Sequence, residues 1–414
     1  MRPGKLLLVG GAEILHRQEI MRSFVELAGG PSGPFLVAPT ATSAPVKFTE
    51  RLRSWLAEVG VDPSRVEVLE VSRHVPGWEA GARDPRQLEK VERAAGLWFL
   101  GGDQGAITSA FLEPGGGDSP LLAAIRRRYE AEELAVGGTS AGAAVMSDPM
   151  IGGGTSFGAL ALPRAARGAD GELSRELSLL KGFGFFPDGI VDQHFDTRAR
   201  LGRLLEAAMS EEGPRRLAFG IAEATGLRRV GSEGSLSAVG AGSVILLDAR
   251  TARRFAVSTR AGPRTRVEGA VLHCMTAGDR FLPDEGGFDF GRKEAIEAGD
   301  AALDAEFPEA SGVLSPYGDL AGFASRMLLD NDPGRLFLDP RTGLRYVRSL
   351  LVEEAPLPGG DRAPLGWELR LYRLDPGPGR SGAGASRLHY DGRYSFENVR
   401  VDVIPLEIEI RRPD

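Results

Sequence analysis

Short apolar runs alternate with longer polar segments through the first half of the chain. The runs cover residues 6–9, 35–38, 66–71, 97–100 and 134–136 and have the length and composition of buried strands. The segments between them include 46–59 and 86–95, in which apolar residues recur at the spacing of one helix face. This strand–helix alternation predicts an α/β fold whose parallel sheet is covered by helices on both faces.

Three glycine-rich segments follow predicted strands of this sheet. They are Gly10–Gly11, Gly101–Gly102 and Gly137–Gly138. Glycine permits tight turns and lets a ligand approach the backbone closely. Because ligands of such sheets bind beyond the carboxyl ends of the strands, the three segments predict a functional site at that edge.

The pattern changes after about residue 218, where short strands with glycine-rich turns follow one another. We expect these strands at 219–221, 226–230, 235–238, 244–247 and 255–257, and we expect the first domain to close near residues 278–281. The predicted domains are therefore 1–285, an α/β domain, and 286–414, a C-terminal extension of mixed helix and β-strand.

The C-terminal extension begins with a predicted helix at 292–303. Apolar residues later alternate with polar ones around Trp367 and again around Val401, which predicts half-exposed strands. Residues 376–386 are rich in glycine, proline and serine and predict a surface loop. The extension carries no motif from which a role can be assigned.

Composition narrows the class of protein. The 414 residues carry a net charge of −7, which offers no general attraction to nucleic acid or to an anionic membrane. The single cysteine, Cys274, lies in an apolar run and predicts a buried thiol rather than a disulfide. No apolar run has the length of a signal-peptide core or a membrane span, so we expect a cytoplasmic protein.

Ser140 is the first candidate for chemistry. It lies in Gly138-Thr-Ser-Ala-Gly142, which fits the G-x-S-x-G pattern of a nucleophile on a sharp strand-to-helix turn. A predicted strand precedes the motif and a helix of small residues follows it, which is the context that the motif requires. The N–H groups at the start of that helix would face a developing oxyanion.

His194 is the best candidate for the base among five histidines. It follows an apolar run and precedes a helix, whereas His273 lies inside a strand pattern and the other three lack nearby polar partners. Three arginines follow it: Arg198, Arg200 and Arg203. Arg200 and Arg203 share a helix face, and arginine binds carboxylates with two parallel hydrogen bonds, so the cluster predicts an anionic substrate.

A catalytic histidine also needs an acid that orients it. Glu223 ends an apolar strand and is the preferred candidate, although Asp192 and Asp196 are nearer in sequence and stay open as alternatives. No cluster of histidine, cysteine and carboxylate has zinc-like spacing, and no nucleotide-binding glycine motif is present, so we expect neither metal nor cofactor.

Four segments together resemble the cyanophycinase family, serine peptidases of the S51 type that are related to aspartyl dipeptidase. They are Phe99-Leu-Gly-Gly-Asp-Gln104, Gly137-Gly-Thr-Ser-Ala-Gly-Ala143, Asp192-Gln-His-Phe195 with its three arginines, and Gly220-Ile-Ala-Glu223. The resemblance covers about residues 5–285, so the first domain would be the catalytic one. It departs from the family pattern at Ala222, where an acidic residue is usual, and it assigns nothing to the extension.

The resemblance implies a flavodoxin-like sandwich similar to class I glutamine amidotransferases, and a homodimer. It implies hydrolysis of cyanophycin, a poly-aspartate with arginine on each side-chain carboxylate, to β-Asp-Arg dipeptides. Ser140, His194 and Glu223 would be the triad, with Ala141 and either Gly102 or Asp103 as oxyanion donors. The substrate pocket would be formed by Gln104, Asp192, Gln193, Arg198, Arg200 and Arg203.

Two other functions fit the same residues. A dipeptidase of the same fold would use the same triad on short aspartyl or isoaspartyl peptides. A non-catalytic protein would use the arginine cluster to bind a carboxylate ligand.

Overall fold

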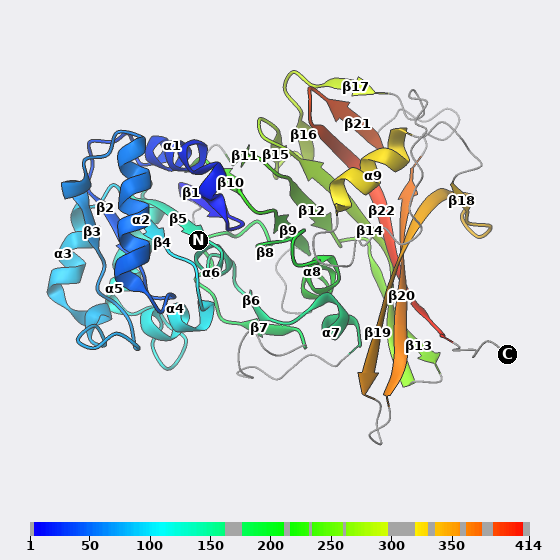
Figure 1. Cartoon of the computed structure of the whole chain (residues 1–414), viewed down its shortest axis with the longest axis horizontal. Helices are drawn as coiled ribbons and strands as arrows, with labels where there is room; N and C mark the ends of the chain where they lie inside the picture. Colours follow the sequence, from blue (N-terminus) through cyan, green and yellow to red (C-terminus); the bar gives the residue numbers. More distant parts are fainter. Residues whose placement is uncertain are drawn as a thin grey trace.

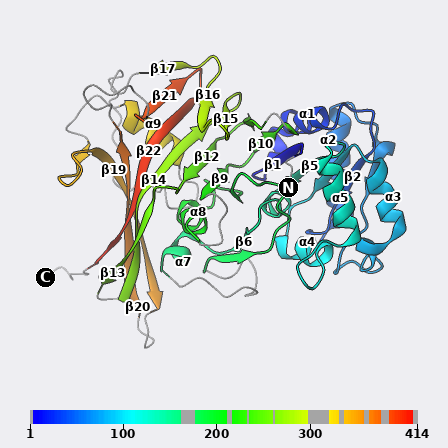
Figure 2. The same cartoon turned by 180° about the vertical axis from the view of Figure 1, so that it is seen from behind.

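The computed structural model describes residues 4–161, 176–210, 216–231, 234–259, 262–296, 319–329, 336–356, 362–374 and 384–408. Two large sheets dominate these residues. Figure 1 shows a helix-covered sheet at one end of the molecule and a sheet with long strands at the other. The view from behind in Figure 2 shows the same division.

The first sheet has nine strands, and its parallel half is the one that the sequence predicts. In spatial order its parallel strands are β1 (Leu6–Val9), β5 (Ala135–Thr139), β4 (Gly96–Phe99), β2 (Phe35–Ala38) and β3 (Val66–Val68). Antiparallel strands continue the sheet beyond β1: β10 (Thr225–Arg229), β11 (Leu236–Gly240), β15 (Arg280–Leu282) and β16 (Gly287–Asp289). Strands β1, β2, β4 and β5 are nearly continuous runs of apolar residues and glycine because both of their faces are buried, whereas the edge strand β3 is partly exposed at Glu67 and Val68.

Helices cover both faces of this parallel sheet, which confirms the α/β prediction. On one face Leu7, Val9 and Trp98 pack with α1 (Arg17–Leu27) and α2 (Pro45–Glu58). The opposite face packs against α3 (Pro85–Arg93), α4 (Gln104–Phe111), α5 (Pro120–Glu130) and α6 (Ala141–Ala144). Short 3-10 turns lie at Glu13–Leu15, Pro63–Arg65 and Gly81–Arg83.

Local signals in the sequence fix where these helices begin. Asp84, Asp103 and Ser119 each accept a backbone N–H in the first turn of α3, α4 and α5. Proline stands in the first turn of α2, α3 and α5, where its missing N–H has no helical partner to lose.

The second sheet joins strands from both predicted domains. Its main path runs through β18 (Phe337–Leu338), β19 (Arg345–Pro356), β20 (Arg362–Arg373), β22 (Tyr394–Leu406), β14 (Gly262–Met275), β12 (Val244–Asp248), β9 (Leu217–Ile221) and β8 (Ile190–Asp192). At its margins lie β13 (Arg253–Thr259), β17 (Glu294–Ile296) and β21 (Arg387–Tyr390). Conversely β16, which begins after residue 285, pairs with β15 in the first sheet. Each sheet therefore contains strands from both sides of residue 285. The predicted domain boundary at that residue stays a prediction.

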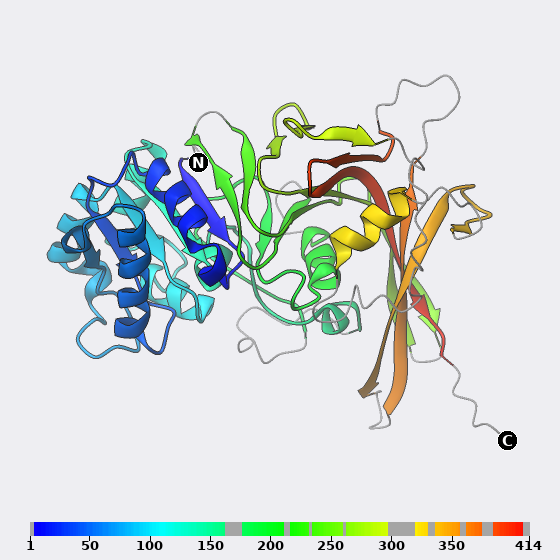
Figure 3. The same cartoon turned by 45° about the horizontal axis from the view of Figure 1, so that its top comes forward.

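One apolar core lies between this second sheet and its helices. The helices are α7 (Ser156–Ala161), α8 (Leu201–Ala208) and α9 (Leu320–Leu329), and Figure 3 shows α9 lying against the long strands. Trp367 of β20 is fully buried and contacts Phe157 of α7 edge to face, at 5.5 Å between ring centroids. The predicted alternation around Trp367 and Val401 is present, and its apolar face points into this core. A separate two-stranded sheet consists of β6 (Met150–Gly153) and β7 (Ser178–Leu180).

The helix predicted at 292–303 is wrong where the structure describes it. Residues 294–296 form β17 and pair with β21 near residue 389, so a strand from far along the chain determines their conformation. Residues 297–303 and most of the predicted loop at 376–386 lie outside the described residues. Cys274 is fully buried, as expected. Among the described helices none has both the length and the apolar character needed to cross a membrane.

Candidate active site

Ser140 stands on a sharp turn between β5 and α6. Its backbone adopts φ 53° and ψ −115°, a conformation that non-glycine residues rarely adopt. Its own N–H donates to the carbonyl of Val9 at 2.9 Å, which fixes the turn to the end of β1. A Cβ at Gly138 would lie 2.3 Å from the carbonyl oxygen of Gly142, so the turn can close only with glycine there. This geometry is that of a nucleophile elbow.

His194 and Glu223 meet Ser140 at this edge of the sheet. The Ser140 hydroxyl donates to Nε2 of His194 at 2.9 Å, and Nδ1–H of His194 donates to Oε1 of Glu223 at 2.6 Å. We assign the proton to Nδ1 because a carboxylate can only accept. The three residues therefore form one continuous hydrogen-bonded chain with the order that a triad requires.

Of the two alternative acids, neither has this contact. Asp192 is fully buried and its two oxygens accept from Arg203 at 2.8 and 2.6 Å. Asp196 lies two residues beyond His194, and one of its oxygens is buried without a partner among the described residues. The geometry therefore favours Glu223 as the residue that orients His194.

Gly10 and Gly11, at the end of β1, join the loops that carry the histidine and the glutamate. The N–H of His194 donates to the carbonyl of Gly10, and the N–H of Ala224 donates to the carbonyl of Gly11, both at 2.8 Å. Gly11 has φ +102°, and a Cβ there would lie 2.3 Å from the imidazole ring of His194. Glycine at position 11 is thus required by both the backbone conformation and the position of the ring.

The environment of His194 favours the neutral form of its imidazole. Burial lowers the pKa of His194 from 6.5, the hydrogen bond to Glu223 raises it, and the positive charges of Arg198 and Arg200 lower it again. The net shift is downward. A neutral imidazole at neutral pH can accept the proton of Ser140.

The predicted oxyanion donors differ in what they already bind. The N–H of Asp103 donates to the carbonyl of Ala41 at 2.9 Å, so it is already used. In the described backbone the N–H groups of Ala141 and Gly102 donate to no carbonyl. Gly102 lies beside Ser140 on the wall of one cavity. Between the two candidates in that loop, the geometry favours Gly102 over Asp103.

The three predicted arginines differ in how far they are buried. Arg200 and Arg203 are 5% and 4% exposed, and both donate to Asp192, which lies at the end of β8. Arg203 also donates to the carbonyl of Gly154 at 2.6 Å. Arg198 instead lies exposed in the turn that precedes α8. The structure therefore places two arginines in an internal ion network and one at the surface.

The two predicted glutamines are buried near this network. Gln104 donates its amide to the carbonyl of Gly152 at 2.6 Å, and its Oε1 has no partner among the described residues. Gln193 is 2% exposed, and its Oε1 is likewise without a partner there. Arg200 donates to the Gln193 carbonyl.

Two polar residues at the site were not identified from the sequence. Thr197 donates to Oε1 of Glu223 at 3.2 Å, or to the carbonyl of His194 at 3.3 Å. Glu13 is 6% exposed and accepts from the hydroxyl of Thr139, the residue before Ser140, at 3.0 Å. Its place directly after the Gly10–Gly11 turn, at the ligand-binding edge of the sheet, was the available signal.

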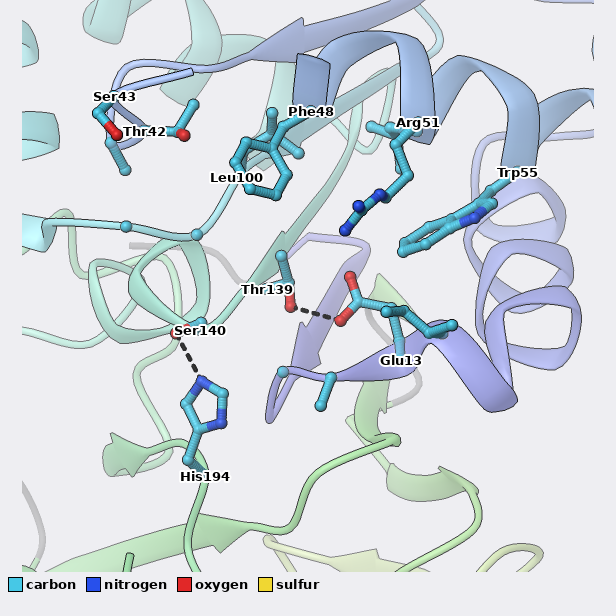
Figure 4. A pocket seen from close by; sticks show the side chains of 17 residues that line it. Glu13, Thr42, Ser43, Phe48, Arg51, Trp55, Leu100, Thr139, Ser140 and His194 are labelled. Carbon is cyan, nitrogen blue, oxygen red and sulfur yellow. Dashed lines mark hydrogen bonds between the residues drawn. The ribbon is translucent and has the colours of Figure 1, made fainter. Parts of the chain in front are cut away.

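A cavity of about 450 Å³ opens beside Ser140 (Figure 4). Ser140, His194 and Glu13 line it from one side, and side chains of α2 line it from the other. Within the described residues no group of three or more histidine, cysteine or acidic side chains could hold a metal ion. The chemistry that this arrangement can perform is nucleophilic attack by Ser140 with His194 as base.

Comparison with known proteins identifies relatives of the chain. A cyanophycinase of Geminocystis herdmanii is 31% identical over 283 residues, which are 67% of this chain and 92% of the relative. A cyanophycinase of Trichormus variabilis is 31% identical over 280 residues, 67% of this chain and 84% of the relative. A cyanophycinase of Synechococcus elongatus is 33% identical over 249 residues, which are 60% of this chain and 69% of the relative. No family model matches the chain.

Two solved structures are similar in part. A peptidase from an acI-B1 actinobacterium has a TM-score of 0.48 at 21% identity and covers 68% of this chain and 97% of its own. A putative peptidase E from Listeria monocytogenes has a TM-score of 0.38 at 13% identity, and the match covers 58% of this chain and 100% of that structure's chain. The identity to the curated relatives, over most of their length, shows that the chain belongs to the cyanophycinase family.

Proposed function

We propose that this protein is a serine-type peptidase that hydrolyses cyanophycin to β-Asp-Arg dipeptides through an acyl-enzyme. The observation that carries the proposal is the hydrogen-bonded chain from Ser140 through His194 to Glu223 on a nucleophile elbow. The names of the curated relatives supply the substrate, a polymer of aspartate that bears arginine.

In the first half of the reaction, Oγ of Ser140 attacks the carbonyl carbon of a backbone amide. Its proton passes to Nε2 of His194, and the N–H groups of Ala141 and Gly102 donate to the oxygen that becomes negative. The tetrahedral intermediate then collapses: the C–N bond breaks, and the imidazolium of His194 protonates the leaving amine.

In the second half, a water molecule takes the place of the amine. His194 removes its proton as the water oxygen attacks the ester carbonyl, and the proton returns to Oγ of Ser140 when the C–O bond breaks. Glu223 holds Nδ1–H throughout and stabilises the imidazolium in both halves.

The predicted substrate residues divide into two roles. Arg198 is exposed and can contact a carboxylate of the substrate directly. Arg200 and Arg203 hold Asp192 and would thereby position the loop of His194. Arg200 also donates to the carbonyl of Gln193 in that loop. Gln104 and Gln193 present amide oxygens that a guanidinium could satisfy.

Product analysis tests this function. Purified protein is incubated with cyanophycin, with β-Asp-Arg and with α-aspartyl dipeptides, and the products are identified by mass spectrometry. Release of β-Asp-Arg from the polymer supports the proposal, whereas cleavage of the dipeptides alone would establish a dipeptidase. Ser140→Ala should lower turnover on the order of 10⁶-fold. A variant with most of its activity left would refute Ser140 as the nucleophile. Binding of the polymer without cleavage by the unaltered protein would instead support a carboxylate-binding protein.

Three further properties belong to this proposal. We propose a flavodoxin-like, glutamine amidotransferase-like arrangement for the α/β part, a cytoplasmic location and a homodimer. Light scattering of the purified protein tests the last of these properties. A homodimer should have a measured molar mass twice the 44.1 kDa of one chain.

A further inference from the structure

The cavity beside Ser140 has a polar end that the reaction above does not use. Glu13, Arg51 and Trp55 lie at this end, and Ser140 and His194 lie at the other (Figure 4). We call it the Glu13 cavity. Its volume of about 450 Å³ is that of a small-molecule site. The predicted substrate residues Gln104, Asp192, Gln193, Arg198, Arg200 and Arg203 do not line it.

Glu13 is a buried acid in the wall of this cavity. One oxygen accepts from Thr139 at 3.0 Å, and the carboxylate points toward the guanidinium of Arg51 (Figure 4). Among the described residues, however, Glu13 forms no ion pair within 4.0 Å. Burial raises the pKa of Glu13, although its hydrogen bonds and the charge of Arg51 oppose that rise. A cationic ligand would stabilise the carboxylate in this desolvated position.

The wall contributed by α2 suits a flat cation and an anion together. Phe48 and Trp55 present aromatic rings to the cavity, on which a guanidinium can stack. Arg51 is half-buried, lies 5.3 Å from the ring centroid of Phe48 and forms no salt bridge among the described residues. Its guanidinium can therefore accept a carboxylate ligand.

We propose that the Glu13 cavity is a second substrate subsite that holds an arginine residue of the polymer, with the guanidinium on Glu13 and the free carboxylate on Arg51. The inference rests on the proposed function, because each arginine of that polymer carries both groups. Since Ser140 lines the same cavity, this arginine belongs to a unit next to the bond being cleaved. Glu13, Arg51 and Trp55 would thus determine specificity in a cavity that Asp192 and the other predicted substrate residues do not line.

Binding of a small probe tests the subsite without any turnover. Nα-acetyl-L-arginine carries the guanidinium, the free carboxylate and the acylated amine of the polymer unit. Calorimetry is performed on the Ser140→Ala protein and on the same protein with Glu13→Gln or Arg51→Gln. We expect each added substitution to weaken binding at least about tenfold, the effect of losing one charged hydrogen bond.

Two matched ligands separate the roles of the two residues. Agmatine lacks the carboxylate, so Arg51→Gln should leave its affinity unchanged while Glu13→Gln still weakens it. Nα-acetyl-L-citrulline lacks the positive charge, so Glu13→Gln should not weaken it. Glu89→Gln, an exposed substitution on α3, is the control and should change none of these affinities.

The proposal is overturned if Nα-acetyl-L-arginine binds equally to all the variants, or if it does not bind at all. Thermal unfolding of each variant identifies any that fails to fold; Arg51 is only half-buried, so its variant provides the test if Glu13→Gln does not fold. Because the probe is measured in protein that lacks Ser140, these outcomes are independent of whether Ser140 proves to be the nucleophile.

Discussion

Ser140 and its two partners depend on the protonation of one imidazole. The base must be neutral to accept a proton, and burial lowers the pKa of His194 below 6.5. Activity should therefore be retained as the pH falls toward 6.5 and should be lost only at lower pH, when His194 becomes protonated. A pH profile of kcat/KM, which reports the free enzyme, measures this acid limb.

Glu223→Gln tests the same chain of hydrogen bonds. The amide lacks the charge that raises the pKa of His194, so the acid limb should move to still lower pH. Turnover should fall by as much as roughly 10⁴-fold, because an amide can also hold the wrong tautomer of the imidazole. Turnover and an acid limb that both stay unchanged would mean that Glu223 does not orient His194.

Gly11 is the second residue whose chemistry follows from its position. In Gly11→Ala the new methyl group would overlap the ring of His194, at 2.3 Å from Cε1. The φ of +102° at this position would also strain an alanine. We expect kcat to fall about 10²-fold or more, because a shift of about 1 Å in a catalytic group has that effect.

Gly29→Ala is the matched control for this substitution. Gly29 also has a positive φ of +84°, but a Cβ there meets nothing within 4 Å. It should lose stability, which thermal unfolding measures, and keep its turnover. If both variants lost activity equally, backbone strain rather than contact with His194 would be the cause.

At the scale of elements, a buried ion network fixes α8 to β8. Asp192 and Arg203 are 0% and 5% exposed in their side chains and share two hydrogen bonds. Removing either partner alone leaves a buried charge unpaired, so Arg203→Met or Asp192→Leu should each lower the free energy of unfolding by about 3–5 kcal/mol. The double variant should lose less than the sum of the two. Urea unfolding of all four proteins measures the cycle, and additive losses would show that the pair is not coupled.

The elements themselves differ in how far their sequence determines them. The five parallel strands could be predicted because each lies in a mostly apolar run, although Glu67 interrupts the run of β3. The candidate triad could also be named, since each of its residues follows such a run. The strand at 294–296 was not predicted, because its local sequence favours a helix and its partner lies near residue 389.

Pairing between strands could not be predicted either. β9 and β10 are separated by three residues, yet they lie in different sheets. The hydrophobic pattern predicts that a residue is buried, but it does not identify the residues against which it packs. The buried partners of Asp192 and the contacts of Glu13 depend on this tertiary packing.

At the scale of the molecule, one apolar core unites residues on both sides of position 285. Trp367, Leu369 and Val401 are fully buried in the cluster that also contains Phe157 and Leu204. A chain that ends at residue 285 would expose the other half of this cluster and leave β14 without β22. We expect such a chain to aggregate, because large exposed apolar faces associate. Size-exclusion chromatography beside the full chain measures this; a monodisperse, fully active fragment would show that residues 286–414 form an independent domain.

Ser140 belongs to the first sheet, through β5, whereas His194 and Glu223 follow β8 and β9 of the second. The contact of 2.9 Å between Ser140 and His194 is therefore also a contact between two sheets. A small rotation of one sheet against the other would separate Ser140 from His194 while the strands within each sheet kept their own partners. We therefore expect the activity to depend on the position of the two sheets relative to each other. In a urea titration, activity should disappear at a lower concentration than the far-ultraviolet signal of the strands.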